Sequence, residues 1–463
     1  MPRPIATFAL ALTLPLLYPG ALRAQSSVAI TGATLLDGTG AAPVTDAAVI
    51  VRDGRITCAG PRPSCPVPKG ARRIDARGTW LIPGLVDAHV HFSQTGWFDG
   101  RPDAADLRER YPYAEVVAGL EAHPERFFRT YLCSGVTSVF DVGGYPWTWA
   151  MRDRYTDSPT APRIAAAGPL LTTIDHWLNL PAQRQFVYMA NDSVVRDAVR
   201  ANAAFKSDGV KIWYVMPPQP PDTARAQALV RTAADEAHRL GLRLLVHATG
   251  LWEAKDALRA GADVLVHSVF EQPVDSEFIE LARSHKAIYI TTLMAGEGYI
   301  VAGQGKVDGH RYPLACADSA SRALVASGPV QGQRGRAWWT DTAAIRNIDQ
   351  EVATGQANTK RVHDAGITIA VGTDAGNPGS LHGPSIYREL VLLSEAGIPP
   401  MDLLTEATLN GARAMGREHD VGTVTPGKLA DLVALDADPL ADPRNYQRVR
   451  WVMKGGALIP RPR

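Results

Sequence analysis

Eight short apolar runs, separated by helical patterns, constrain the fold of this chain more than any other feature. The runs span residues 86–92, 136–142, 164–171, 209–215, 242–248, 264–269, 288–293 and 368–374. Between them, segments such as 224–240 and 252–260 have the apolar spacing of amphipathic helices. Strands that alternate with helices form parallel sheets, and eight such units over this length predict an α/β (β/α)8 TIM barrel. Two further helices are expected at 397–404 and 405–415.

Both ends of the chain carry shorter strand and turn patterns. Runs at 28–30, 33–36, 47–51 and 55–58 lie near the start, and runs at 431–435 and 449–453 lie near the end. Gly, Asp and Pro separate these runs, as turns require. Because chain ends often lie close together, residues 25–83 and 421–463 are expected to build one small β-sandwich beside a barrel of residues 84–420.

Residues 1–24 have the pattern of a secretory signal peptide. Arg3 is followed by the apolar residues 5–17, and Leu22-Arg23-Ala24 offers a cleavage site before Gln25. A retained membrane anchor is the alternative. No other apolar run is long enough to span a bilayer. The sequence therefore predicts a secreted or periplasmic protein with no membrane span after the signal is removed.

Export would place the four cysteines in an oxidising compartment. Cys58 and Cys65 are separated by a turn-rich segment, and we expect them to pair. Cys133 and Cys316 are expected to be isolated thiols. None of the four has C-x-x-C spacing, so a thiolate metal site is not expected.

Charge and segment length limit the remaining choices. The chain has 48 Lys and Arg against 47 Asp and Glu, so no excess of basic residues argues for binding of nucleic acid, and we expect none. The segment 295–339, after the seventh run, is long and rich in Gly and polar residues. Such a segment is either a lid or binding loop, or a mobile insertion.

Polar side chains occur where the predicted barrel strands end. They are His89 and His91 on the first strand, Lys211 on the fourth, His247 on the fifth, His267 on the sixth and Asp374 on the eighth. Each has an ordinary structural explanation: a lysine can reach the edge of a strand, a core histidine can be hydrogen-bonded, and an aspartate can cap a helix. In a TIM barrel, however, active sites lie at these strand ends. Five strands with metal-compatible groups at one rim therefore predict a divalent metal site.

The motifs around these residues resemble the metal-dependent amidohydrolase superfamily from about residue 28 onwards. They are Pro83-Gly84-Leu85-Val86-Asp87-Ala88-His89-Val90-His91, Gly135-Val136-Thr137-Ser138-Val139 with Asp141, His247-Ala248-Thr249, Gly372-Thr373-Asp374-Ala375-Gly376 and Pro426-Gly427-Lys428-Leu429-Ala430-Asp431. The region from Asp374 through His382 to Arg388-Glu389-Leu390 is most similar to one branch. That branch contains Xaa-Pro and Xaa-Arg dipeptidases, ochratoxin-type amidases and imidazolonepropionases.

The resemblance implies a centre with two divalent metal ions, and zinc (Zn2+) is the expected metal. In similar enzymes, residues matching His89, His91 and Asp374 bind one ion and residues matching His247 and His267 bind the other. A carbamylated Lys211 would bridge the two ions, since a carbamate is anionic where a protonated lysine would repel both. An unmodified lysine beside one metal is the alternative.

The implied reaction is hydrolysis of a C–N amide bond by a hydroxide held between the metals. Asp374 is the expected catalytic residue, which accepts a proton and passes it to the leaving nitrogen. We expect a small-molecule substrate, either a hydrophobic dipeptide or an N-acyl amino acid. Imidazolonepropionases generally lack the bridging lysine, so Lys211 argues against that reaction. Related dipeptidases usually have a small, Gly-containing stretch after the lysine, where this chain has Ile212-Trp213-Tyr214-Val215.

Two other functions stay open. One is a cyclic amidase similar to an imidazolonepropionase or hydantoinase, and the other is a metal-free interaction protein. The sequence also leaves open whether the chain forms a homo-oligomer.

Four residues are predicted to contact the substrate. Trp213 shares the strand face of Lys211, and His176, Tyr214 and His382 are polar candidates for binding a carboxylate. Further aromatic residues that follow strand ends predict an aromatic-lined mouth: Trp147, Trp149, Trp177 and Trp252.

Overall fold

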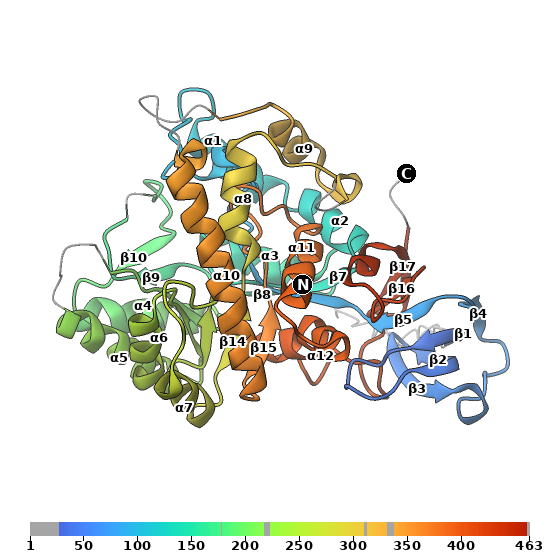
Figure 1. The fold of residues 1–463 in the computed structure, drawn as a ribbon. Helices are drawn as coiled ribbons and strands as arrows, with labels where there is room; N and C mark the ends of the chain where they lie inside the picture. Colours follow the sequence, from blue (N-terminus) through green and yellow to red (C-terminus); the bar gives the residue numbers. More distant parts are fainter. Residues whose placement is uncertain (1–26, 177, 217–222, 310–312, 331–337, 461–463) are drawn as a thin grey trace, which may run out of the picture.

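The computed structural model describes residues 27–176, 178–216, 223–309, 313–330 and 338–460. A large α/β body lies beside an eight-stranded sheet, in which strands from the two ends of the chain lie side by side (Figure 1). The expected signal peptide and Trp177 fall outside the described residues.

The eight-stranded sheet combines strands from the two ends of the chain. Its strands are β1 (Ser27–Leu35), β2 (Val44–Arg52), β3 (Arg55–Pro61), β4 (Arg72–Asp75), β5 (Trp80–Pro83), β16 (Leu432–Leu435), β17 (Val449–Lys454) and β18 (Ala457–Ile459). Their order is β18-β17-β16-β5-β1-β2-β3, and β4 pairs with β1. The two ends meet where β5 pairs antiparallel with β16. These strands belong to one eight-stranded sheet, so the division into two sandwich layers stays a prediction.

The large body contains two parallel sheets. One holds β6 (Leu85–Val90), β7 (Val136–Asp141) and β8 (Arg163–Ala166), and the other holds β9 (Leu170–Thr172), β10 (Phe186–Tyr188), β11 (Val210–Trp213), β12 (Leu244–His247), β13 (Val264–Val266), β14 (Ile288–Thr291) and β15 (Thr368–Val371). The third expected strand is thus divided into β8 and β9. The backbone N–H of Asp374 donates to the oxygen of His89 at 2.9 Å, which joins the end of β15 to the end of β6. Parallel strands with helices are confirmed, and closure into one barrel stays a prediction.

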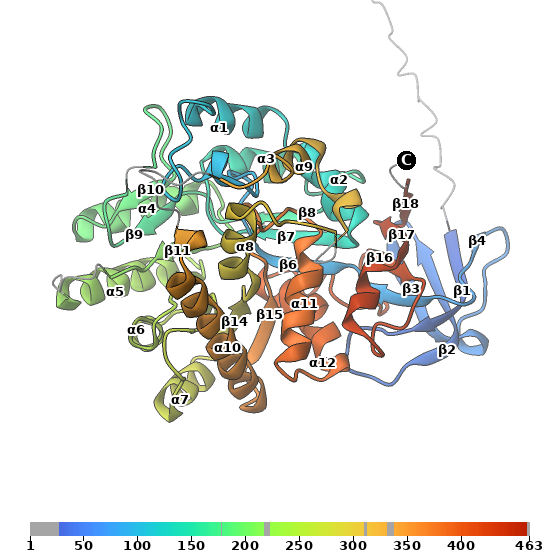
Figure 2. The same ribbon diagram turned by 45° about the horizontal axis from the view of Figure 1, so that its top comes forward.

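Helices follow most of these strands. They are α1 (Tyr113–Ala122), α2 (Glu125–Cys133), α3 (Trp147–Tyr155), α4 (Asp192–Ala204), α5 (Thr223–Arg239), α6 (Leu251–Ala260), α7 (Ser276–Ser284), α8 (Met294–Gly303), α9 (Ser319–Val325), α10 (Thr342–Asp364), α11 (Ser385–Glu395), α12 (Pro400–Thr405) and α13 (Gly411–Ala414). Helices α4 to α7 succeed one another along the seven-stranded sheet (Figure 2). Asn191 and Asp275 cap α4 and α7 by accepting backbone N–H bonds. Within the described ranges, none of the helices combines the length and apolar character needed to cross a membrane.

The long segment after β14 contains helices rather than a continuous loop. Helix α8 begins at Met294, and α9 follows before the long helix α10. The side chain of Glu389 on α11 accepts hydrogen bonds from the backbone N–H groups of Leu293 and Met294, at 3.0 and 2.9 Å. This buried carboxylate therefore fixes the start of α8.

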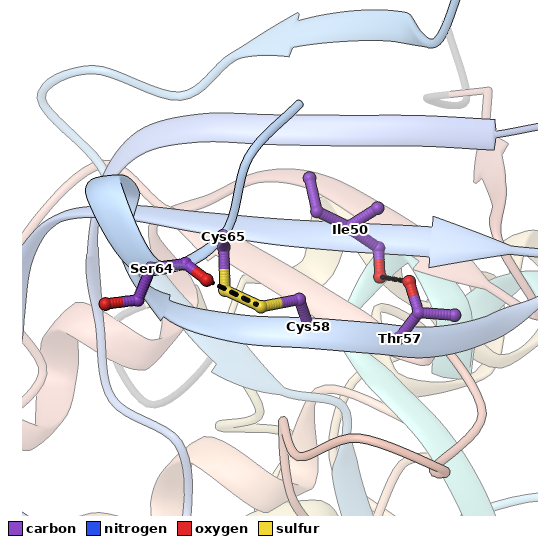
Figure 3. Close-up of a disulfide and its surroundings, with 5 residues drawn as sticks. All are labelled: Ile50, Thr57, Cys58, Ser64 and Cys65. Carbon is purple, nitrogen blue, oxygen red and sulfur yellow. Dashed lines mark hydrogen bonds between the residues drawn. A yellow bond between two sulfur atoms is a disulfide. The ribbon is translucent and has the colours of Figure 1, made fainter. Parts of the chain in front are cut away.

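Two disulfides cross-link the chain. Cys58 and Cys65 pair at a Cα–Cα distance of 5.7 Å, as expected from their spacing (Figure 3). The expectation of isolated thiols at Cys133 and Cys316 is wrong, because these two residues form the second disulfide. Cys133 ends α2, and Cys316 lies in a 3-10 turn (Leu314–Cys316) packed against that helix. The bond therefore tethers the segment between β14 and α10 to α2.

Candidate active site

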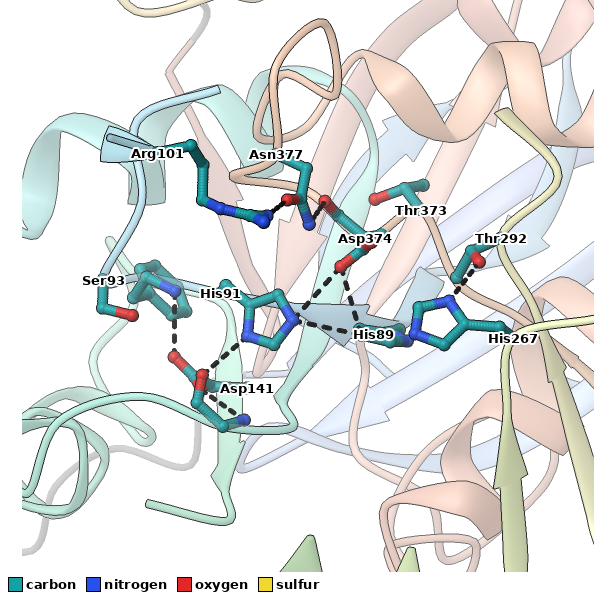
Figure 4. A network of polar contacts seen from close by, with 12 residues as sticks. His89, His91, Ser93, Arg101, Asp141, His267, Thr292, Thr373, Asp374 and Asn377 are labelled. Atoms are coloured by element: carbon teal, nitrogen blue, oxygen red, sulfur yellow. Dashed lines mark hydrogen bonds and ion pairs between the residues drawn. The ribbon is translucent and has the colours of Figure 1, made fainter. Parts of the chain in front are cut away.

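The two histidines at the end of β6, His89 and His91, point to one place. Both are buried, and their Nε2 atoms lie 3.2 Å apart (Figure 4). Nδ1 of His91 lies 2.6 Å from the backbone oxygen of Gly143. Because that oxygen can only accept, Nδ1 carries the proton and Nε2 of His91 keeps a free lone pair. This arrangement is typical of a metal-binding imidazole held by a hydrogen bond from its other nitrogen.

Asp374 joins this pair from the segment that follows β15. Its Oδ1 lies 3.2 Å from Nε2 of His89 and 3.1 Å from Nε2 of His91. Buried Asp87 holds the two strand ends together, since its carboxylate accepts the backbone N–H groups of Thr373 (3.0 Å) and His89 (3.3 Å) and the hydroxyl of Thr373 (2.6 Å). Burial raises the pKa of Asp87 to about 7. The residues beside Asp374 are thus positioned by a carboxylate that the sequence analysis did not select.

His247 and His267 complete the histidine cluster. Their ring centroids are 4.4 Å apart, and the ring of His267 lies 4.7 Å from that of His89. Nδ1 of His267 lies 2.7 Å from the hydroxyl oxygen of Thr292. His267 and Asp374 both adopt positive φ angles, of 77° and 55°. Such backbone conformations are unfavourable for these residues and cluster at functional sites.

Lys211 is buried on β11 and lines the same cavity as His91, His247 and Asp374. Burial lowers the pKa of its amine to about 7, although nearby Asp374 opposes this shift. A substantial fraction of the amine is therefore neutral near pH 7. A neutral amine is the form that reacts with CO2 to give a carbamate.

The side chains in this cluster suit divalent cations. Burial lowers the pKa of His89 to about 3 and that of His247 and His267 well below the usual range, so these imidazoles are neutral. Atoms of His89, His267 and Asp374 lie within 4.8 Å of one another. Oδ1 of Asp374 has no hydrogen-bond partner among the described residues, although it is buried. Neutral imidazoles around a buried carboxylate oxygen are the ligands that zinc and similar ions accept.

Two cavities, of about 220 and 270 Å3, meet at this cluster. Both are lined by His247, His267, Tyr299 and Asp374. Two of the predicted substrate contacts, His176 and Trp213, line the smaller cavity. A substrate could therefore extend from the cluster in two directions.

The other two predicted substrate contacts lie outside both cavities. The hydroxyl of Tyr214 donates to Asp256 at 2.8 Å, because alternation along β11 turns it away from the face of Lys211. Nδ1 and Nε2 of buried His382 lie 2.7 Å from the hydroxyl of Tyr131 and 2.9 Å from the oxygen of Gln94. Both ring nitrogens of His382 are therefore occupied by the protein itself.

The predicted aromatic mouth is also only partly present. Trp147, Trp149 and Trp252 line neither cavity, and Trp149 stacks on Phe205 with ring centroids 4.8 Å apart. The sequence analysis missed Arg101, Asn377 and Tyr299 in the cleft. Asn377 lies three positions beyond Asp374, and Tyr299 belongs to the segment predicted to be a lid or binding loop. Arg101 lies in a stretch with no recognisable pattern.

Comparisons with known proteins identify relatives that match most of this chain. Over 436 residues, the chain is 28% identical to an imidazolonepropionase of Salinispora tropica, covering 90% of this chain and 93% of the relative. It is 25% identical over 478 residues to an ochratoxinase of Aspergillus niger, covering 95% and 88%. It is also 25% identical to a 5-methylthioadenosine/S-adenosylhomocysteine deaminase of Symbiobacterium thermophilum, covering 88% and 85%.

Similar proteins are also found among the solved structures. A Xaa-Pro dipeptidase with bound methionine in its active site superposes with a TM-score of 0.70 at 25% identity, covering 94% of this chain and 100% of the other. The A. niger ochratoxinase superposes with a TM-score of 0.70 at 19% identity, covering 95% and 96%, which supports the fold alone. Residues 80–459 match the amidohydrolase family. With the histidine, lysine and aspartate cluster in place, this chain belongs to the amidohydrolase family.

Proposed function

We propose that this protein is an exported hydrolase that cleaves the C–N amide bond of a hydrophobic dipeptide or an N-acyl amino acid. The main support is that six side chains meet where the two cavities join. They are His89, His91, Lys211, His247, His267 and Asp374. The similarity to an ochratoxinase and to a Xaa-Pro dipeptidase favours amide bonds as the target.

In this proposal the cluster holds two divalent cations, with zinc as the expected metal. His89, His91 and Asp374 would hold one cation, His247 and His267 would hold the other, and a carbamate formed from the amine of Lys211 and CO2 would contact both. Two such cations supply a nucleophile from water near neutral pH and polarise the scissile carbonyl. Carbamate formation requires the neutral amine, which the buried position of Lys211 favours.

Asp374 is the proposed general base and acid. Its carboxylate lies where the two cavities meet, so a scissile bond between them is within its reach. It takes a proton from the attacking water and delivers it to the leaving nitrogen. Oxygen from water bonds to the acyl carbon, the C–N bond breaks, and a carboxylic acid and an amine are released. Asp87 holds the backbone beside Asp374 during this transfer.

We further propose that the two parallel sheets close into one (β/α)8 barrel and that the mixed sheet folds as a small sandwich. The backbone hydrogen bonds between the ends of β15 and β6 support closure. The leader pattern supports secretion or export to a periplasm. The two disulfides fit that location, because disulfides persist in oxidising compartments.

Metal analysis and turnover test the proposal together. Purified protein should contain two metal ions per chain and should hydrolyse members of a panel of dipeptides and N-acyl amino acids when supplied with zinc, cobalt or manganese. Lys211→Ala should lower the metal content, and a small carboxylic acid should restore it. Asp374→Asn should remain folded and lose activity. A metal-free, inactive wild-type protein would favour an interaction protein, and an unchanged metal content in Lys211→Ala would exclude the bridging role.

A cyclic amidase is the second candidate function. The 28% identity with an imidazolonepropionase favours it. Opening of cyclic imides without turnover of any linear amide would establish this function in place of the first.

A further inference from the structure

The cleft has two arms of different chemistry, which meet at the histidine cluster. We call the smaller cavity the arginine arm, since Arg101, Gln185 and His176 line it. We call the larger cavity the apolar arm, since Phe270, Leu293, Ile348 and Val352 line it. His247, His267, Tyr299 and Asp374 line both arms. A substrate whose scissile bond lies at the cluster would therefore place one half in each arm.

Arg101 presents a fixed hydrogen-bonding edge in the arginine arm. Its Nε and Nη2 donate to Oδ1 and Oδ2 of Asp103 at 2.9 and 2.8 Å, and its Nη1 donates to Oδ1 of Asn377. These bonds use three of the five N–H groups of the guanidinium, and two have no acceptor among the described residues. The side chain is only 19% exposed. Because Asp103 holds the planar group in place, the remaining donors are oriented before any ligand binds.

The connection between Arg101 and Asp374 indicates which group of a substrate Arg101 can bind. Asn377 connects them, since its Oδ1 accepts from Arg101 and its Nδ2 donates to the backbone oxygen of Asp374 at 3.4 Å (Figure 4). In a dipeptide or an N-acyl amino acid, a single carbon atom separates the scissile nitrogen from the α-carboxylate. Arg101 and Asp374 line the same arm, so a carboxylate one carbon atom from a scissile nitrogen at Asp374 is the group that we place at Arg101. Planar carboxylates are the group that an arginine fork binds best.

The apolar arm suits the other half of such a substrate. Ile348 and Val352 are four residues apart on α10, so they present one helix face to the cavity. Leu293 and Phe270 line the same cavity. The same lining includes Thr249, Ser268 and Glu351, but, among the described residues, no arginine or lysine that would pair with a second carboxylate. The half of the substrate that enters it is therefore the acyl half, with a bulky hydrophobic side chain.

We propose that Arg101 binds the α-carboxylate of the residue that leaves with the scissile nitrogen, and that the apolar arm binds the hydrophobic side chain on the acyl side. The inference rests on the proposed amide hydrolysis and names its substrate class. The protein requires a free carboxylate next to the scissile bond, so it acts on the last bond of a peptide and not on internal ones.

Matched substrates test the carboxylate site. Wild-type protein should hydrolyse Phe-Ala at least 30-fold faster, in kcat/KM, than Phe-alaninamide. Arg101→Met should remove this preference by lowering kcat/KM for the acid, and Arg101→Lys should retain part of it. Arg388→Met is the matched control, because Arg388 also pairs with a carboxylate, that of Glu297 at 3.0 Å, and lies outside both arms. Its acid-to-amide ratio should equal that of the wild type.

A second substitution tests the apolar arm. Val352→Trp fills part of this cavity, so the ratio of kcat/KM for Phe-Ala to kcat/KM for Gly-Ala should fall at least tenfold relative to wild type. Equal cleavage of acid and amide by the wild-type protein would overturn the carboxylate site and leave the proposed amide hydrolysis intact. This comparison uses the wild-type protein alone, so it does not depend on whether a variant folds. Absence of turnover for every linear amide would overturn the proposed function and this inference together.

Discussion

The disulfide between Cys133 and Cys316 should contribute more to stability than the one between Cys58 and Cys65. The two bonds close loops of very different length, with sequence separations of 183 and 7. In the loop-entropy description, a closed loop of 183 residues stabilises the folded state by about 5 kcal/mol and one of 7 residues by about 2 kcal/mol. The difference arises because a long cross-link removes more conformations from the unfolded chain.

Other contacts should preserve the folded geometry when the long cross-link is removed. The segment that carries Cys316 is also held by an ion pair between Arg126 and Asp318 and by a hydrogen bond from the hydroxyl of Ser321 to the oxygen of Thr95, at 3.1 Å. Replacing both cysteines by serine should therefore lower the free energy of unfolding and leave the cleft intact.

Urea unfolding of three oxidised proteins provides the measurement. They are the wild type, the Cys133→Ser, Cys316→Ser double variant, and the Cys58→Ser, Cys65→Ser double variant as a control for serine substitution. The long-loop variant should lose about 5 kcal/mol and the short-loop variant about 2 kcal/mol. Reduced wild type should lose at least as much as the long-loop variant. A long-loop variant that loses no more than the short-loop variant would refute the reasoning.

Two further predictions concern individual side chains. Burial raises the pKa of Glu389 from 4.5 to about 7. Between these pH values the folded protein holds a proton that the unfolded chain lacks. The free energy of unfolding therefore falls as pH rises through this window. At about 1.4 kcal/mol per pKa unit, the free energy of unfolding of the wild type should fall by about 3 kcal/mol relative to that of Glu389→Gln between pH 4.5 and 7.5. Urea midpoints of the two proteins that shift in parallel would contradict this. On β11, Trp213→Ala should raise KM about tenfold, a loss of about 1.4 kcal/mol. Tyr214→Phe should leave KM unchanged and lower the free energy of unfolding by about 1–3 kcal/mol, because Asp256 loses its hydrogen-bond partner. A rise in KM for Tyr214→Phe would instead show that this side chain contacts the substrate.

The sequence predicted the members of the histidine, lysine and aspartate cluster because strand patterns depend on neighbouring residues alone. A few residues are enough to recognise the alternation along a strand and the position of its end. These two signals identified His89, His91, Lys211 and His247. The same alternation separates Trp213, which lines the cleft, from Tyr214, which does not. His382 shows the limit of that reasoning: it lies in a motif, and only the packing of Tyr131 and Gln94 around its ring removes it from the cleft.

The sequence by itself determined the alternation of strands and helices, the union of the two chain ends, the short disulfide and the identities of the six clustered side chains. Each depends on periodicity, spacing or a contiguous motif. Only the tertiary structure decided which distant residues meet. It paired Cys133 with Cys316 across 183 residues, brought Arg101 to Asn377, and divided the cleft into the arginine arm and the apolar arm. These contacts join segments far apart along the chain, and packing of the whole fold, rather than any local pattern, sets them.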